Sequence, residues 1–231
     1  MRKKKKYTLI TSGIFFVLFL VMILLVKFVD VQPIGPEGSS IGLSKLNGAF
    51  AKLFPFSNFW YKLTNIAGYL CILYGLCFAL IGLRQLIRRK SLAKVDKTLY
   101  ALAGFFVLLG IVYVFFEVVK VNYRPVIIDP AEGLEASFPS SHTVLSCSLM
   151  GAIMIELKCL LRKRSKRLPF DFVCILLMVI TILGRIFSGA HWITDIIAGI
   201  FLSGALAFLF YYVIIRIRIK ERKARKSWDY V

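Results

Sequence analysis

The chain has 231 residues, of which 58% are hydrophobic and 19% charged, and it carries a formal net charge of +19. Its apolar residues form several uninterrupted runs of membrane-spanning length, which excludes an ordinary soluble domain and predicts a membrane protein. The positive charge does not require a nucleic-acid partner, because its distribution along the chain follows a topology rule of membrane proteins, as described below.

Six apolar runs predict an all-α, polytopic membrane protein that forms one domain over residues 1–231. The first run follows five basic residues, as in a signal peptide, but it is too long for one and no small-residue cleavage site follows. We therefore expect a retained span. The six predicted spans are residues 8–27, 66–83, 98–119, 142–161, 170–187 and 193–215.

Residues 29–62, between the first two spans, place several aromatic side chains among lysines. This mixture is typical of the headgroup interface, where aromatic rings sit in hydrocarbon and polar tips stay wet. Two interpretations remain open. The segment is either a lid or lateral gate for a lipid, or a loop that is anchored in the interface.

Basic residues are distributed unevenly between the two sides that the spans define. One side receives 24 of the 31 lysines and arginines, in the N-terminus, two loops and the tail of residues 216–231. The positive-inside rule therefore predicts a multi-pass protein of the plasma membrane with both termini in the cytoplasm. The five cysteines all fall in apolar runs without paired spacing, so we interpret them as packing residues.

The predicted outer side gathers the residue types that phosphoryl transfer needs. Both histidines of the chain lie there, at or near the ends of spans. Around them are two guanidiniums, one ammonium, two hydroxyls and one carboxylate. The full set of candidates is His142, His191, Arg124, Arg185, Lys120, Ser140, Ser141 and Asp195.

Each candidate has a chemical role in such a site. Guanidiniums bind phosphate oxygens and stabilise the charge of the transition state, and the two serines with the free N–H groups of a helix start also cradle an anion. Asp195 follows His191 by four residues, so its carboxylate can hold one ring N–H and present the other nitrogen as a nucleophile. His142 is left to protonate the departing alkoxide. No metal ligand set remains, and no cofactor is implied.

The same residues resemble the motifs of a known family, the type 2 phosphatidic acid phosphatases, which share their site with vanadium-dependent haloperoxidases. The family motifs are Lys-x6-Arg-Pro, Pro-Ser-Gly-His and Ser-Arg-x5-His-x3-Asp. They appear here as Arg124-Pro125, as Pro139-Ser140-Ser141-His142 and as Gly184-Arg185 through His191 to Asp195. The resemblance implies a phosphohistidine at His191, assisted by Asp195, with His142 as the acid, the arginines on the phosphate and a site on the outer face.

The sequence departs from these motifs at three positions. Glu117 stands at the spacing of the family's lysine, and the nearest lysine is Lys120, one turn closer to the outer surface. We therefore predict that Lys120 binds phosphate, with Glu117 turned away or serving to orient Lys120. Ser141 replaces a glycine and Gly184 replaces a serine.

Together these features predict a metal-independent membrane phosphatase that hydrolyses a phosphate monoester or diphosphate of a lipid. Undecaprenyl diphosphate and phosphatidylglycerophosphate are the lead substrates, and membrane lipids are the expected surroundings. The alternative is a non-catalytic protein that binds or transports lipid phosphates with the same basic pocket. The spans contain few polar residues, which disfavours transport. The sequence leaves the substrate and the oligomeric state open.

Overall fold

The computed structural model describes residues 2–228, and this part of the chain is all-helical. Six of its helices are long and apolar enough to cross a membrane, which confirms the predicted fold class. Residues 229–231 of the predicted basic tail lie outside the described residues. The six helices are α1 (Arg2–Phe28), α3 (Asn58–Arg89), α4 (Lys97–Val118), α5 (Ser141–Leu160), α6 (Arg164–Phe187) and α7 (Ile193–Trp228).

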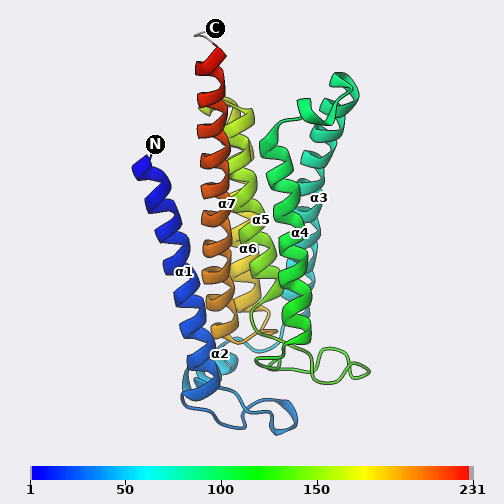
Figure 1. Cartoon of the computed structure of the whole chain (residues 1–231). Coiled ribbons are helices and arrows are strands. Elements are labelled where there is room, and N and C mark those ends of the chain that lie inside the picture. The colour runs from blue at the N-terminus through cyan, green and yellow to red at the C-terminus, as the bar shows by residue number, and fades with distance from the viewer. Residues whose placement is uncertain (1, 229–231) are drawn as a thin grey trace.

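The six long helices run side by side, and they alternate in direction (Figure 1). Helix α1 begins and α7 ends at one end of the bundle, where the α3–α4 and α5–α6 connections also lie. We call this the basic end, because it carries most of the lysines and arginines. The opposite end holds the short helix α2 (Ser44–Leu53), the long α4–α5 loop and the α6–α7 loop.

Several helices are longer than the spans that hydropathy predicts. Helix α3 begins eight residues before the predicted span of 66–83 and ends six residues after it, and α7 continues well beyond residue 215. Hydropathy detects only the stretch that matches the hydrocarbon layer, about 20 residues of helix. Helical hydrogen bonding does not stop at that boundary, so polar and basic residues extend the helices into the interface.

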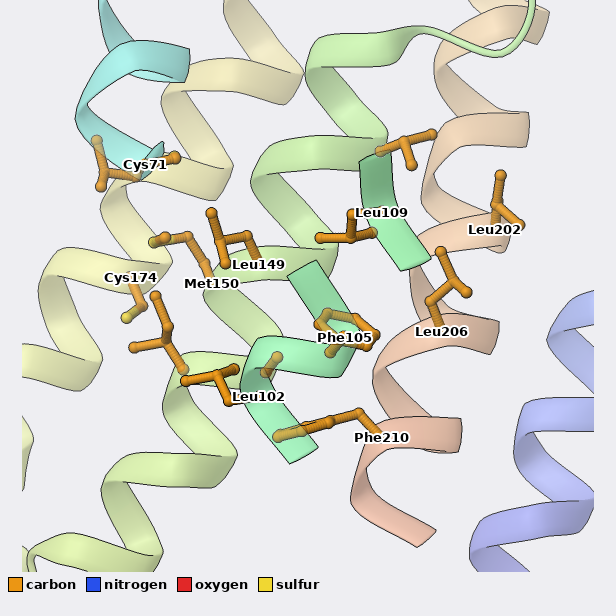
Figure 2. Close-up of a cluster of buried hydrophobic side chains, with 14 of the residues drawn as sticks. Cys71, Leu102, Phe105, Leu109, Leu149, Met150, Cys174, Leu202, Leu206 and Phe210 are labelled. Atoms are coloured by element: carbon orange, nitrogen blue, oxygen red, sulfur yellow. The ribbon is translucent and has the colours of Figure 1, made fainter. Parts of the chain in front are cut away.

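Helix α5 is the central helix of the bundle, because it packs against α3, α4, α6 and α7. Small residues on α5 and α7 let the two backbones approach closely, as is usual between membrane helices. Around them lies a cluster of buried apolar side chains (Figure 2). It includes Cys71, Leu102, Phe105, Leu149, Met150, Cys174, Leu206 and Phe210. All five cysteines are free.

The segment between α1 and α3 is tied to the start of α7. Asn47, a fully buried residue of α2, donates from Nδ2 to the Gly42 carbonyl at 2.8 Å. Its Oδ1 accepts from the hydroxyl of Thr194, in the first turn of α7, at 3.2 Å. Further along, the Ser57 backbone N–H donates to the carbonyl of Ser188 at 3.0 Å. This segment therefore supports the loop that leads into α7.

Candidate functional site

The predicted site residues come from three segments at the end of the bundle opposite the basic end. One is the α4–α5 loop with the first turn of α5, and another is the last turn of α6. The third is the α6–α7 loop with the first turn of α7. In chain order they supply Arg124, Ser140, Ser141, His142, Arg185, His191 and Asp195.

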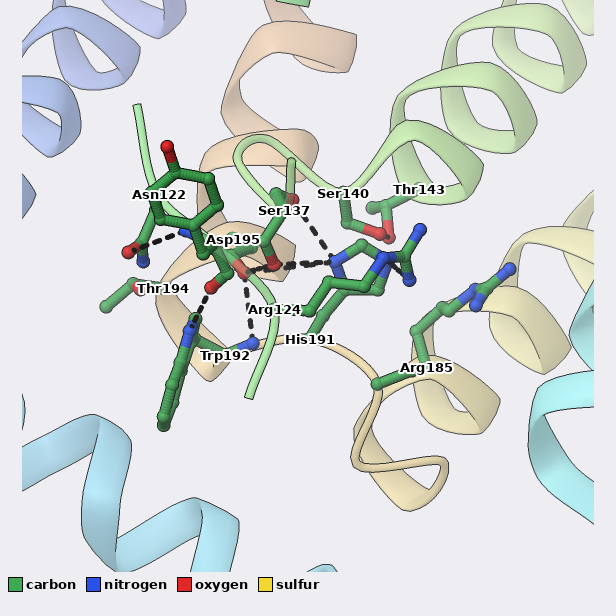
Figure 3. A network of polar contacts seen from close by, with 12 residues as sticks. Asn122, Arg124, Ser137, Ser140, Thr143, Arg185, His191, Trp192, Thr194 and Asp195 are labelled. Carbon is green, nitrogen blue, oxygen red and sulfur yellow. Dashed lines mark hydrogen bonds and ion pairs between the residues drawn. The ribbon is translucent and has the colours of Figure 1, made fainter. Parts of the chain in front are cut away.

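The α4–α5 loop folds back on itself before α5 begins. Tyr123 and Ala136 form an antiparallel bridge, and the Arg124 backbone N–H donates to the carbonyl of Glu135 at 3.1 Å. The side chains of this pair also meet, with Arg124 Nε 2.8 Å from Glu135 Oε2. The fold-back brings Arg124 and Ser137 together beside the α6–α7 loop (Figure 3).

His191 is held by Ser137, a residue that the sequence did not single out. Its Nδ1 lies 3.1 Å from the Ser137 carbonyl oxygen and 3.2 Å from the Ser137 hydroxyl (Figure 3). The Ser137 hydroxyl also donates to Asp195 Oδ2. Asp195 Oδ2 itself lies 3.8 Å from Nδ1, beyond hydrogen-bond distance. The direct carboxylate–imidazole bond predicted from the spacing is therefore replaced by a contact through Ser137.

This arrangement fixes which nitrogen of His191 is available for chemistry. A carbonyl oxygen only accepts hydrogen bonds, so Nδ1 carries the proton and Nε2 presents its lone pair. Nε2 lies 3.5 Å from Nη1 of Arg124. Burial lowers the pKa of His191, and the nearby Arg124, Arg185 and His142 lower it further. The ring is therefore neutral at neutral pH and suited to act as a nucleophile.

Arg185 is a fully buried cation without a carboxylate partner in the described part of the chain. Its Nη2 donates to Oδ1 of Asn65 at 2.7 Å, and its guanidinium lies 5.2 Å from the ring centre of Tyr61. Nε and Nη1 have no hydrogen-bond partner. A buried guanidinium with unused donors is costly unless an anion neutralises it. The local structure therefore favours an anionic ligand at this position.

His142 is the second residue of α5, and it shares one cavity with His191. Its Nδ1 has no hydrogen-bond partner. Ser141 also lines the cavity, whereas the buried Ser140 accepts a hydrogen bond from Thr143 at 3.1 Å. The backbone N–H of Ser140 donates to the carbonyl of Asp195 at 3.1 Å, which ties α5 to α7.

The cavity has a volume of about 640 Å³ and lies among α3, α4 and α5. Its lining along α3 runs from Tyr61 to Leu76, which corresponds to about 20 Å of helix. Most of the lining is apolar, and Ile72 and Leu76 are also exposed on the outer surface of the bundle. The cavity thus connects the two histidines with a surface that faces hydrocarbon, as a lipid ligand requires.

Known proteins share both the sequence pattern and the fold. The sequence model of the PAP2 superfamily matches residues 117–219, which contain all the predicted site residues. The part of the chain that carries the site therefore belongs to the PAP2 superfamily. The earlier resemblance to type 2 phosphatidic acid phosphatases is thereby confirmed.

A solved structure resembles this PAP2 chain over nearly its whole length. It is the crystal structure of a transmembrane PAP2 type phosphatidylglycerolphosphate phosphatase from Bacillus subtilis, with a TM-score of 0.64 and 17% sequence identity. The similarity covers 90% of this chain and 97% of that chain. At this identity the comparison shows a common fold. No curated protein matched the sequence.

Two of the three departures from the PAP2 motifs have a structural explanation. A Cβ atom at Gly184 would lie 2.4 Å from Cγ2 of Thr64, so glycine lets α6 approach α3 closely enough for Arg185 to meet Asn65. Ser141 is the first residue of α5, and it is not among the residues with positive φ. A glycine is therefore not required there, and the serine adds no backbone strain.

The third departure is Glu117 at the position of the family's lysine, for which Lys120 was expected to substitute. Lys120 is exposed, its Nζ lies 5.8 Å from the ring centre of Tyr123, and it is not among the described residues that line the cavity. Glu117, which was expected to turn away or to orient Lys120, lines the cavity. Contacts connect His191 with Arg124 and, through Ser137, with Asp195, whereas the contact described for Lys120 is with Tyr123.

The structure adds three polar residues that sequence reasoning missed, namely Asn65, Ser137 and Asn47. Ser137 stands three residues before Ser140 in the loop that carries Arg124, which was a usable signal for a site residue. Asn65 and Asn47 carried no comparable signal, because their roles depend on the packing of α3 and α2. Among residues 2–228, no group of three or more His, Cys, Asp or Glu side chains is placed to hold a metal ion.

Proposed function

We propose that this PAP2 protein is a metal-independent lipid phosphatase that acts through a phosphohistidine at His191. One observation carries the proposal: a neutral imidazole presents Nε2 to Arg124, beside the buried Arg185 with unused donors. A cavity that reaches the hydrocarbon-facing surface leads to the same histidine. This arrangement combines a nucleophile, an anion site and a path for a lipid chain.

In the proposed reaction, the lipid phosphate binds to the guanidiniums of Arg124 and Arg185. Nε2 of His191 attacks phosphorus, and the bond from phosphorus to the lipid oxygen breaks as protonated His142 gives its proton to that oxygen. The Ser137 carbonyl and hydroxyl, with Asp195 behind them, hold the Nδ1 proton as positive charge develops on the ring. Water then attacks the phosphohistidine, His142 takes the water proton, and inorganic phosphate leaves.

Phosphatidylglycerophosphate and undecaprenyl diphosphate remain the lead substrates. The solved structure that shares this fold is described as a phosphatidylglycerolphosphate phosphatase, which supports testing that lipid first. Purified protein in detergent should release inorganic phosphate from one of the two lipids. The release should persist in the presence of chelators, and vanadate should inhibit it. Lipid that binds without phosphate release would instead support the rival, a non-catalytic binding protein.

We further propose that residues 1–231 form one membrane domain with the site on the outer face of the plasma membrane. The basis is the distribution of charge, since the site lies at the end of the bundle opposite the basic end. In a cysteine-free background, a cysteine at Glu132 should react with an impermeant thiol reagent in intact cells. A cysteine at Ser165 should react only after lysis, and the reverse pattern would overturn the orientation.

A further inference from the structure

Glu117 lies in the last turn of α4 and lines the same cavity as His142 and His191. Among the described residues that line this cavity, it is the one that carries a full formal charge when the histidines are neutral. Tyr113, one turn earlier on α4, also lines the cavity and interacts with Glu117 through its side chain. A carboxylate and a phenol therefore stand together on the α4 wall.

The carboxylate of Glu117 is not committed to a cation in the described part of the chain. Glu135 is paired with Arg124 at 2.8 Å and Asp195 lies 3.8 Å from His191, whereas Glu117 forms no such ion pair among the described residues. An ionised carboxylate accepts several hydrogen bonds and donates none. Glu117 consequently offers acceptor oxygens to whatever occupies this part of the cavity.

The position of Glu117 restricts the ligands that the cavity favours. The scissile phosphate is held by the arginines, and a carboxylate on the same cavity repels further negative charge. It attracts a group that donates hydrogen bonds, and charge-assisted bonds of this kind are stronger than neutral ones. Across from α4, Tyr61 and Asn65 of α3 add polar atoms at the same end of the cavity, whereas Ile72 and Leu76 make the other end apolar. The polar end suits a head group and the apolar end suits a chain.

We propose that Glu117, with Tyr113, forms a head-group subsite that selects lipid phosphates bearing a hydroxyl or ammonium donor beside the phosphate. It selects against lipids in which the phosphate is the whole head group. This inference rests on the proposed lipid phosphatase function. It gives Glu117 a role in specificity that differs from the earlier expectation of a side chain turned away or serving Lys120.

The test compares two lipids with identical acyl chains and identical charge, namely phosphatidylglycerophosphate, whose glycerol carries a free hydroxyl, and its analogue with 1,3-propanediol in place of that glycerol, which lacks the hydroxyl. The ratio of their kcat/KM values should fall about tenfold in Glu117→Gln, because a charge-assisted hydrogen bond is lost. It should fall at least as far in Glu117→Lys, because an ammonium has no acceptor for the hydroxyl. Glu132→Gln and Glu132→Lys, made at an exposed loop residue, are the matched controls and should keep the wild-type ratio. A ratio that stays at the wild-type value in both Glu117 variants would overturn the inference.

A binding measurement separates this inference from the proposed function. The affinities of the same two lipids are measured by native mass spectrometry in His191→Ala protein, with and without Glu117→Gln. The preference for the hydroxyl-bearing lipid should shrink by about the same factor when Glu117 is changed. If wild-type protein hydrolyses neither lipid, the phosphatase proposal fails, and this binding preference still decides the role of Glu117. An unchanged preference would overturn the subsite even in an active enzyme.

Discussion

The two sides of the site differ in how firmly their charged side chains are held. On the α6–α7 side, Arg185, His191 and Asp195 are buried and connected to neighbours by hydrogen bonds. At the end of α4 opposite the basic end, Glu117 is exposed in the last turn of the helix and Lys120 is exposed just beyond it. The buried side retains the arginine, histidine and aspartate of the third motif, while the exposed side has Glu117 where the first motif has lysine. This difference fits the proposal that the buried side performs the chemistry and that the exposed side sets the ligand preference.

The largest expected effect comes from the nucleophile on the buried side. His191→Ala should lower kcat by about four orders of magnitude or more, because no other group takes the phosphoryl group. Brief incubation of His142→Ala with labelled substrate should trap an acid-labile phosphoenzyme, provided that the leaving group can still depart. Residual activity of His191→Ala near the wild-type value would point to a different nucleophile.

Arg185 should give the next largest effect. Arg185→Ala should lower kcat/KM by roughly 10²- to 10³-fold, because the variant lacks the buried guanidinium that binds the transferred phosphate in the proposed reaction. Arg185→Lys should recover little, because an ammonium cannot reproduce the forked contacts to phosphate and Asn65. Arg164→Ala, at the exposed start of α6, is the control and should be near wild type. Equal losses in the two alanine variants would mean that charge in general, not this contact, matters.

Ser137 should have a smaller effect that is specific to its hydroxyl. Ser137→Ala removes the link between His191 and Asp195 but keeps the backbone carbonyl, so kcat should fall roughly tenfold. Ser137→Thr keeps the hydroxyl and should restore most of the lost rate, with KM unchanged in both variants. Failure of threonine to restore the rate would favour a purely structural role for the serine.

Asn47, which holds the start of α7, should contribute measurably to the stability of the protein. Asn47→Ala leaves the hydroxyl of Thr194 and the carbonyl of Gly42 without their partner, which costs about 1–3 kcal/mol for such buried groups. The melting temperature in detergent should fall, and activity should fall with it. Asn58→Ala, at the exposed start of α3, is a suitable control.

The exposed side should be the most tolerant for the chemical step. Lys120→Ala should change kcat/KM by less than about threefold, because the ammonium is solvated and lies over Tyr123. The exposed Lys62→Ala provides the comparison. A loss as large as that of Arg185→Ala would return Lys120 to the phosphate site and erase the contrast between the two sides.

The sequence predicted the spans because hydropathy over about 20 residues directly reflects the thickness of the bilayer. The sequence also predicted that five site residues lie at the same end of the bundle, because successive spans place their connecting loops at alternate ends. These residues are Arg124, His142, Arg185, His191 and Asp195. Contacts between distant segments were not accessible in this way. Ser137 stands between His191 and Asp195 only because the α4–α5 loop folds back, and a helical spacing of four had suggested a direct bond.

The expectation for Lys120 rested on helix periodicity beyond the point where the helix ends. A spacing of three residues on a continuing helix would have placed it on the face of Glu117, but α4 ends at Val118. Beyond that residue the chain leaves the helical path, so helix periodicity no longer predicts where a side chain lies. Glu117, still within the helix, keeps its place on the cavity wall.

The first and last helices of the described chain, α1 and α7, pack against each other, and the Ser12 hydroxyl donates to the Ala205 carbonyl at 2.7 Å. During synthesis, α1 and α2 are made long before α7, the helix that both of them contact. The hydrogen-bond partners of Asn47 and Ser137, which are Thr194 and His191, are synthesised only when most of the chain has been made. A nascent chain that ends after its fifth long helix consequently lacks His191 and Asp195. The proposed site is therefore complete only when α7 has been made and has packed into the bundle.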